Sequence, residues 1–599
     1  MCGIIGYVGA RSAGEIIYRG LENLEYRGYD SAGVALVGEQ LAIHKRAGEV
    51  AELTVPEDET ATCGIGHTRW STHGPPTDIN AHPHVDCAGE VAVVHNGIIE
   101  NHEALRDILD GCEFVSETDT EVIPHLLEQE VHDGASLTDA VASVADAIEG
   151  SYAFAVVHAG ENTIVATREQ SPLVLGRGED GMFLASDIPA FLEHTREVAY
   201  LEDGQVATIT ADDIRLGGNA SSPTPTYETV EWDADSAEKG GYEHYMRKEI
   251  HEQPQALRQT LSERIDLNRG TVAVDLDFPT GYLDSVEEVQ FVAAGTSYYA
   301  SRYGARLLEE LADVRTSVTI ASEYEFGGGR DPWRTLTVAV TQSGETTDTL
   351  EAINSAGQAG ARTLAVTNVI GSSVTRSVDD TLFIKAGPEI GVAASKTFSS
   401  QVTTLGLLAV AIAHERDTLP RSQIRRLLGD LNGLPGAIQQ VLDEEDAVRA
   451  VASEYLDMDA FFFIGRELGY PVALEGALKL KEIAYVHAEG FAAGELKHGP
   501  LALVTGRTPV IALLTNGAQP AATTHNVAEA QTRGAPAIGI VAEGRDVEHL
   551  DVEFTVPSSG LFEPLVGNVY LQLLAYHIAN QLGRPIDKPR NLAKSVTVR

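Results

Sequence analysis

The sequence predicts an α+β layered domain at the N-terminus, followed by two α/β lobes that each contain a doubly wound parallel sheet. At 599 residues the chain is too long for one hydrophobic core. Short apolar runs dominate the first part, whereas apolar runs alternate with longer helical patterns in the second part. A segment of serine, proline and threonine, residues 220–226, separates the two parts.

The first part is expected to form stacked layers of strands and helices. Its β-like runs are residues 4–8, 31–37, 62–67, 90–95, 151–158 and 162–167. Its helical patterns are residues 13–24, 101–109 and 119–130. Strand runs interrupted by a few helices are typical of α+β layers.

The second part contains a weak internal repeat. The predicted strand 289–294 leads into Gly295-Thr296-Ser297, and the strand 460–464 leads into Gly465-Arg466-Glu467, each before a helix. Strands 335–340 and 509–514 correspond in the same way. We therefore expect two similar lobes, with ligands at the carboxyl ends of the strands. The predicted segments are the first domain 1–220, a linker 221–245, lobes 246–435 and 436–585, and a tail 586–599.

The composition limits the classes of partner and compartment. The chain has 88 acidic and 43 basic residues, a net charge of −45, and only ten lysines. Such an acidic surface argues against nucleic acid, whose phosphates need basic side chains. We expect no membrane, because no apolar run approaches the length of about 20 residues that spans a bilayer. Four cysteines form no disulfide framework, so a cytoplasmic protein is expected.

The first residues carry a candidate nucleophile. Cys2 is followed by the small Gly3, so removal of Met1 would place a thiol and a free α-amine on one residue. An unperturbed α-amine has a pKa of about 7.7–8.0 and is an available base near neutral pH. A thiol beside its own base is an activated nucleophile. By itself, a cysteine after the start methionine more often has no function, and further segments have to favour catalysis.

Three polar segments offer what an attack on an amide needs. Arg69 follows a predicted strand and presents a planar fork for a carboxylate. Asn96 and Gly97 end another predicted strand, and a side-chain amide with a backbone N–H makes a pair of oxyanion donors. Asp119 stands at the start of a predicted helix, where it would bind an ammonium group or, like Thr118, cap the helix.

The histidines of the first domain have plainer interpretations. His82, His84 and Cys87 would supply three ligands to a metal, but their spacing fits no common structural site and no fourth ligand stands out. His67, His73 and His95 are expected to be structural, because the Cys2 amine makes a histidine base unnecessary. We therefore expect no metal.

The second part has three loops rich in serine and threonine that follow predicted strands. Hydroxyls and backbone N–H groups at helix N-termini cradle phosphate with little positive charge. Each loop taken alone is equally well a helix cap, but three at one sheet edge favour a phosphate site. The loops are residues 295–297 (GTS), 341–346 (TQSGET) and 392–396 (VAASK).

The scarce lysines are also informative. Three of the ten lie within residues 475–500, and Lys594 lies near the C-terminus. Lys479 follows Glu475 by four residues, so a plain helix salt bridge is the alternative to a catalytic role. A lysine close to the C-terminus suits Schiff-base chemistry with a ketone.

The first domain resembles the N-terminal-nucleophile glutamine amidotransferases and, within them, the glutaminase domain of the glutamine–fructose-6-phosphate aminotransferases. The segments that carry the resemblance are residues 1–4 (MCGI), 24–31 (LEYRGYDS), 67–74 (HTRWSTHG), 96–97 (NG) and 116–121 (SETDTE). The resemblance implies a domain of αββα layers. It also implies that Cys2 is the nucleophile and that its own amine is the base.

The same resemblance assigns the other residues of this site. Asn96 and Gly97 would form the oxyanion hole. Arg69 and Asp119 would bind the carboxylate and amine of glutamine. Trp70 would gate ammonia, and a loop at Arg27 would help to close the site.

The second part resembles the sugar isomerase domain of the same family, along its whole length. The matching segments are residues 239–250, 295–297, 321–323, 342–346, 475–482, 495–500 and 589–598. The resemblance implies flavodoxin-like lobes and a sugar-phosphate site. The residues expected to contact the substrate are Thr296, Ser297, Gln342, Ser343, Thr346 and Ser395.

The resemblance also implies the roles of the catalytic residues. His498 would open the sugar ring from a partner subunit, so a homodimer is expected. Lys594 would form an imine with C2, and the tail would line a channel for ammonia. Glu482 would move a proton between C1 and C2, assisted by Lys479. The family has Ser-Thr-Lys where this chain has Ala394-Ser395-Lys396, so Ser395 is expected to replace a missing hydroxyl.

The implied reaction takes L-glutamine and D-fructose 6-phosphate to L-glutamate and D-glucosamine 6-phosphate, with no organic cofactor. One alternative is another amidotransferase, such as a phosphoribosyl amidotransferase, but its acidic pyrophosphate-binding motif is not found. The other is a sugar-phosphate-sensing regulatory protein, which would need neither Glu482 nor His498 nor a terminal lysine.

The acidic surface generates a prediction about salt. Self-repulsion destabilises a compact state unless salt screens it, and the Debye length falls from about 10 Å at 0.1 M to about 3 Å at 1 M salt. We expect the free energy of unfolding to be markedly larger in about 2 M KCl than in about 0.1 M KCl. Denaturant unfolding at the two salt concentrations measures this. Equal stability would contradict our hypothesis that the protein comes from a cell with molar internal salt.

Overall fold

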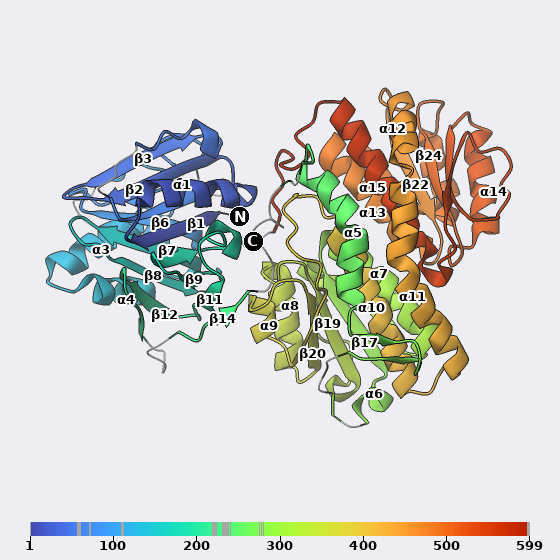
Figure 1. Cartoon of the computed structure of the whole chain (residues 1–599), viewed down its shortest axis with the longest axis horizontal. Helices are drawn as coiled ribbons and strands as arrows, with labels where there is room; N and C mark the ends of the chain where they lie inside the picture. Colours follow the sequence, from blue (N-terminus) through green and yellow to red (C-terminus); the bar gives the residue numbers. More distant parts are fainter. Residues whose placement is uncertain are drawn as a thin grey trace. The chain divides into compact units, whose positions relative to one another are not determined.

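The computed structural model of the chain describes residues 2–56, 61–70, 74–109, 113–169, 171–218, 225–230, 239, 241–274, 276, 278–279 and 281–595. Its contacts divide it into two compact units, Met1–Ala237 with Ala593–Arg599, and Glu238–Leu592. Figure 1 shows both units. Most of the predicted linker lies outside the described residues. The predicted tail is shared, since its first part, up to Leu592, belongs to the second unit.

The N-terminal unit is built on two antiparallel sheets. Eight strands are ordered β14-β11-β9-β10-β1-β4-β2-β3, and six are ordered β13-β12-β8-β7-β6-β5. The strands of the first sheet are β1 (Gly3–Gly9), β2 (Ser31–Val37), β3 (Leu41–Ala47), β4 (Cys63–Arg69), β9 (Val174–Arg177), β10 (Gly181–Ala185), β11 (Glu197–Tyr200) and β14 (Glu228–Thr229). Those of the second are β5 (His84–Val85), β6 (Val91–Ile99), β7 (Gly150–His158), β8 (Ile164–Glu169), β12 (Gln205–Ile209) and β13 (Ile214–Gly218).

Three apolar cores hold the sheets and helices of this unit together. Ile4, Ile65 and Val94 belong to the core that joins the two sheets. The helix α1 (Ala13–Leu24) shares a second core with β1 and β2. Helices α3 (Val122–His132) and α4 (Leu137–Ala147) share a third core with β6 and β7, next to the short α2 (His102–Ile108). The order helix, sheet, sheet, helix confirms the predicted αββα domain.

The second unit contains two α/β lobes with the same topology. One parallel sheet is ordered β18-β17-β19-β20-β21 and the other β23-β22-β24-β25-β26. Both orders read 2-1-3-4-5 along the chain, so the predicted repeat of doubly wound lobes is confirmed. The strands are β17 (Glu288–Ala293), β18 (Arg315–Ile320), β19 (Thr335–Val340), β20 (Arg362–Thr367), β21 (Asp380–Phe383), β22 (Phe461–Gly465), β23 (Ala488–Ala492), β24 (Val510–Leu514), β25 (Ala537–Ala542) and β26 (Val552–Val556).

Helices cover these sheets and join the two lobes. Their bounds are α5 (Tyr245–Leu261), α6 (Tyr282–Ser285), α7 (Gly295–Ala312), α8 (Thr347–Gln358), α9 (Ser373–Arg376), α10 (Lys396–Glu415), α11 (Arg421–Leu442), α12 (Glu445–Glu454), α13 (Gly469–Ala484), α14 (Pro520–Gln531) and α15 (Glu563–Gln581). A short β15–β16 ribbon (Ile265–Asp266, Thr271–Val272) follows α5.

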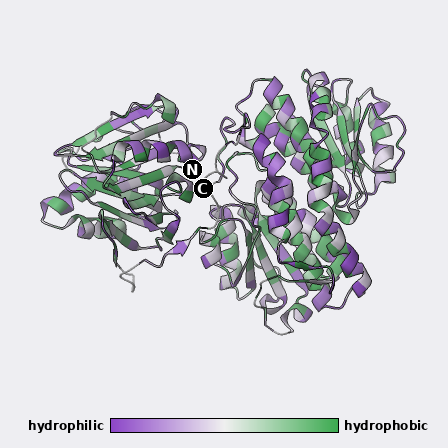
Figure 2. Cartoon of the chain, viewed as in Figure 1, coloured by the Kyte–Doolittle hydropathy of each residue, from purple (hydrophilic) through white to green (hydrophobic). Residues whose placement is uncertain are grey.

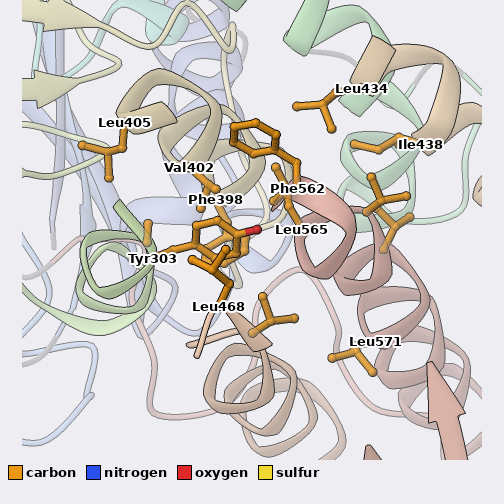
Figure 3. Close-up of a cluster of buried hydrophobic side chains, with 14 of the residues drawn as sticks. Tyr303, Phe398, Val402, Leu405, Leu434, Ile438, Leu468, Phe562, Leu565 and Leu571 are labelled. Carbon is orange, nitrogen blue, oxygen red and sulfur yellow. The ribbon is translucent and has the colours of Figure 1, made fainter. Parts of the chain in front are cut away.

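Side chains from both lobes form one shared core. Tyr303 and Phe398 come from the first lobe, and Leu468, Phe562 and Leu565 from the second, and all are almost fully buried. Figure 3 shows these rings and leucines converging. In Figure 2 the sheet strands of the lobes are mostly hydrophobic, while the helices mix hydrophobic and hydrophilic residues. The two lobes therefore form one body through this core.

One core helix is long and apolar enough to cross a membrane by composition. It is α10, whose most apolar window has a mean hydropathy of 1.2, and 94% of that window is buried inside the protein. Its neighbours are α7, α5 and α11. The helix therefore serves as a core element of the lobes.

Candidate functional site

Cys2 lies immediately before β1, at the centre of the eight-stranded sheet. β1 pairs with β4 on one side and β10 on the other, and Gly3 lies opposite Thr68. This register brings Cys2 to the end of β4, where Trp70 N–H donates to Cys2 Sγ at 3.3 Å. The position of the thiol is therefore set by the strand ladder. Met1 and His73 lie outside the described residues.

The predicted oxyanion pair belongs to β6 in the other sheet. The Asn96 amide nitrogen donates to the Cys2 carbonyl oxygen at 3.2 Å and to Ser186 Oγ at 2.7 Å. Gly97 has φ +122°, and a Cβ there would lie 1.9 Å from the Ser151 carbonyl oxygen, so only glycine fits. The structure thus brings Asn96 together with Cys2.

The orientation of the Asn96 amide follows from its neighbours. His67 Nε2 lies 2.9 Å from the His95 carbonyl oxygen and 3.1 Å from Asn96 Oδ1. Both oxygens are acceptors, so the proton must sit on His67 Nε2. Burial lowers the pKa of His67 to about 3, so the ring is neutral. That donor fixes Oδ1, and Nδ2 consequently points toward Cys2 and Ser186.

His67 belongs to a cluster of buried histidines. The rings of His67 and His82 stack with centroids 4.1 Å apart, and His82 Nδ1 accepts from the His95 N–H at 3.2 Å. His84 Nε2 lies 3.0 Å from Thr118 Oγ1. Burial lowers the pKa of both His82 and His84 well below its usual range. These rings contact one another, the His95 N–H and Thr118 Oγ1, whereas Cys87 Sγ lies 3.7 Å from His125 Nδ1.

The charges of Arg69 and Asp119, the predicted glutamine clamp, act on each other, and Arg69 also acts on the Cys2 thiol. Asp119 is buried and accepts from the Ile99 N–H at 2.8 Å, and it does not cap α3. Arg69 ends β4 and donates to the Gly74 carbonyl oxygen at 3.3 Å. Burial lowers the pKa of Arg69, whereas the nearby Cys2, Asp119 and Asp30 act to raise it. The opposite charges of Arg69 and Asp119 match those of an amino acid's two termini.

Two further predicted residues complete this end of the sheet. The Trp70 ring meets Tyr29 edge to face, with centroids 5.5 Å apart. Arg27 Nε donates to the Cys2 carbonyl oxygen at 3.0 Å and Arg27 Nη1 to Asp187 at 3.2 Å. Burial raises the pKa of the Cys2 thiol, while the positive N-terminus, the Trp70 N–H, Arg69 and Arg27 oppose the rise. A buried thiol of this kind needs a base beside it to become a nucleophile.

The second unit places two of the predicted phosphate loops at adjoining strand ends. Thr296 and Ser297 begin α7 just after β17, and residues 342–346 follow β19. β17 and β19 are parallel neighbours at the point where the strand order reverses, which is where such sheets bind ligands. Gln401 on α10 donates to Ser297 Oγ at 2.9 Å, a contact that the sequence did not indicate.

The loop after β19 is a compact polar turn. Gly344 has φ +72°, and its N–H donates to Thr341 Oγ1 at 3.2 Å. The Glu345 N–H donates to Ser343 Oγ at 3.2 Å, and Thr346 is the residue before α8. The half-exposed Gln342, Ser343 and Thr346 thus lie on one turn that opens a helix, an arrangement suited to a phosphate.

A buried network of charged side chains on α13, in the second lobe, contacts Thr296 at the start of α7. Lys479 Nζ lies 2.7 Å from Glu482 and 3.3 Å from Glu475, and it donates to Thr296 Oγ1 at 3.1 Å. Thr296 Oγ1 in turn donates to Glu475 at 3.2 Å. The site therefore combines residues of both lobes, and Lys479 makes more than the plain helix salt bridge.

Burial and charge tune this network in a specific way. Burial raises the pKa of Glu475 to about 7, although Lys479 acts against the rise. Burial also opposes the charge of Lys479, but the two carboxylates hold its pKa above the ordinary value. Glu482 is the member with solvent access, at 21% side-chain exposure. A partly open carboxylate beside a fixed ammonium suits the transfer of a proton.

Three predicted residues lie apart from this network. His498 ends a 3-10 helix, Ala493–His498, and is exposed. Ser395 is fully buried before α10, and its Oγ has no hydrogen-bond partner among the described residues. Lys594 groups with the N-terminal unit. The roles of these three residues remain predictions.

Comparisons with known proteins match both parts of the chain to known domain families. A family described as a glutamine amidotransferase domain matches residues 67–193, and the SIS domain family matches residues 282–411 and 455–559. The glutamine–fructose-6-phosphate aminotransferase (isomerizing) of Halobacterium salinarum is 56% identical over 600 residues, covering all of both chains. Those of Symbiobacterium thermophilum and Methanosarcina acetivorans are 48% and 44% identical, again over both full lengths.

One solved structure has a fold similar to that of the second unit. The C-terminal domain of glucosamine-fructose-6-phosphate aminotransferase from Francisella tularensis is similar with 35% identity and a TM-score of 0.56, covering 59% of this chain and 99% of that one. Fold and matches together define a class, a glutamine amidotransferase domain joined to two SIS domains. Within that class, full-length identity shows that the chain belongs to the family of isomerizing glutamine–fructose-6-phosphate aminotransferases.

Proposed function

We propose that the protein transfers the amide nitrogen of L-glutamine to D-fructose 6-phosphate, giving L-glutamate and D-glucosamine 6-phosphate for amino-sugar biosynthesis. The observation that carries this proposal is that one chain holds both the Cys2 site and the two-lobe network around Lys479. The first site releases ammonia and the second consumes it. One water is used in hydrolysis and one is released on amination, so the reaction balances.

At the first site Cys2 Sγ attacks the side-chain amide carbon of glutamine. The Cys2 α-amine takes the thiol proton and later protonates the leaving ammonia. The tetrahedral oxyanion accepts hydrogen bonds from Asn96 Nδ2 and Gly97 N–H, and water then hydrolyses the thioester to glutamate. Arg69 holds the substrate carboxylate and Asp119 its ammonium group.

At the second site Ser297, Gln342, Ser343 and Thr346 hold the sugar phosphate, with Thr296 and Ser395 near the sugar. Lys594 forms an imine with C2 of the open-chain ketose, and ammonia displaces it. Glu482 then removes a proton from C1 and returns it at C2, which completes the isomerisation to an aldose. The Lys479 ammonium, 2.7 Å from Glu482, holds this carboxylate in position for these steps.

His498 is assigned to ring opening from a partner subunit. Its exposure on the second lobe supports this assignment, because an exposed imidazole at the end of a 3-10 helix is free to enter a neighbouring site. The functional protein is accordingly proposed to be a homodimer in the cytoplasm. Its substrates are glutamine and fructose 6-phosphate.

The Glu482→Gln variant tests the assignment at the second site. Removing the base should lower glucosamine 6-phosphate formation by at least about a hundredfold, in line with general-base catalysis. Glutamate release at Cys2 should remain. The matched control is Lys481→Gln, which changes an exposed neighbour on the same helix. A Glu482→Gln enzyme with full sugar conversion would rule out the proton-transfer role.

The His67→Phe variant tests how the oxyanion hole is held. Phenylalanine removes the donor to Asn96 Oδ1, so glutamine hydrolysis should lose about tenfold to a hundredfold in kcat, with little change in KM. Synthesis from added ammonia should not change, because that reaction bypasses Cys2. His67→Gln keeps a terminal N–H donor and should recover most of the loss. An equal fall in both activities would indicate a merely structural role.

A further inference from the structure

A second group of polar side chains lies in the N-terminal unit, outside both sites described above. It consists of Cys87, His125 and Glu128, whose ligand atoms all lie within 4.8 Å of one another. Cys87 follows the short strand β5 and is an exposed free thiol. His125 and Glu128 are three residues apart on α3, so both project from one face of that helix.

The distances in this cluster match those between ligands of one metal ion. Tetrahedral zinc with a Zn–S distance of about 2.3 Å and a Zn–N distance of about 2.0–2.1 Å places sulfur and nitrogen about 3.6 Å apart. Cys87 Sγ lies 3.7 Å from His125 Nδ1. His125 Nδ1 lies 3.8 Å from Glu128 Oε2. Little movement is therefore needed to place one ion between the three atoms.

The surroundings hold these ligands in place. The His125 side chain is only 2% exposed, and its ring meets Phe114 edge to face at 4.9 Å. On the other side of the ring, Nε2 lies 4.0 Å from Glu121 Oε1 and has no hydrogen-bond partner among the described residues. Metal-bound histidines usually direct their second nitrogen at a carboxylate in this way. Glu128 also accepts from the Cys87 N–H at 3.3 Å, which orients its carboxylate.

We propose that Cys87, His125 and Glu128 form a binding site for a divalent cation that binds thiolates, such as zinc. A thiolate, an imidazole and a carboxylate suit zinc or cobalt, whereas magnesium and calcium prefer oxygen alone. The exposed side of Cys87 leaves the fourth position for water. The ion links the turn after β5 to α3 and stabilises this part of the domain. It is not required for either reaction.

By holding α3 in place, the bound ion would also stabilise the loop before this helix, which contains Asp119. Glu121 accepts from the Val115 N–H at 2.8 Å and from the Ser116 N–H at 2.7 Å, which closes the loop before α3. A cation on His125 Nδ1 makes the proton on Nε2 a stronger donor toward Glu121. Bound metal should therefore stabilise the loop without contacting glutamine.

The test is a titration of the full chain with Co²⁺ after removal of metals with a chelator. A Cys2→Ala background removes the active-site thiol. We expect one equivalent of Co²⁺ to bind with a thiolate-to-cobalt charge-transfer band and to be displaced by Zn²⁺. We also expect Zn²⁺ to raise the Tm and the chelator to reverse the rise.

Two further variants decide the outcome. Cys87→Ser, at an exposed position, should abolish the charge-transfer band and the shift in Tm. Cys63→Ala is the matched control, because Cys63 is fully buried between the sheets, and this variant should keep both signals. A band that persists in Cys87→Ser, or no band in the background protein, would overturn the proposal.

Discussion

The hydrogen-bonded ladder around β1 is the constraint on which the first site depends. Because β1 lies between β4 and β10, Cys2 has a fixed position next to the end of β4. The same ladder brings Trp70 to the thiol, and the facing sheet supplies Asn96. Ser186 joins the two, since its Oγ accepts from both the Ile4 N–H and Asn96 Nδ2 at 2.7 Å. The pairing of β1 therefore fixes the position of the proposed nucleophile.

The second site obeys a different constraint, the satisfaction of a buried ammonium group. Lys479 has no exposed surface, so its charge must be compensated inside the protein. Glu475 and Glu482 provide that compensation on the same helix, and Thr296 connects the group to the other lobe. Removing any member would leave a buried charge or donor unpaired. The network therefore joins the lobes and orients Glu482, the carboxylate of the network that solvent reaches.

Much of this could be predicted from the sequence, because local patterns determined it. The helix 13–24 is α1 residue for residue, and the strand 31–37 is β2. The short strands β9–β14 were not predicted, since their runs are brief and pairing across the sheets decides their conformation. The helix α4 was also not predicted, although Ser136 caps its N-terminus and its buried residues recur at helical spacing. The predicted nucleophile, the predicted oxyanion pair and Lys479 stood out by residue type and position. Ser186, Gln401 and the partners of Cys87 did not, because long-range folding alone brings them to their contacts.

The central claim is that nitrogen released at Cys2 ends on the sugar. The most direct test uses glutamine labelled with ¹⁵N in its side-chain amide, together with fructose 6-phosphate and unlabelled ammonium at the same time. We expect glutamate and glucosamine 6-phosphate in equal amounts, with the label in the amino sugar. The Cys2→Ala enzyme should form amino sugar only from the unlabelled ammonium. Labelled glutamine that yields glutamate but no labelled amino sugar would contradict the account.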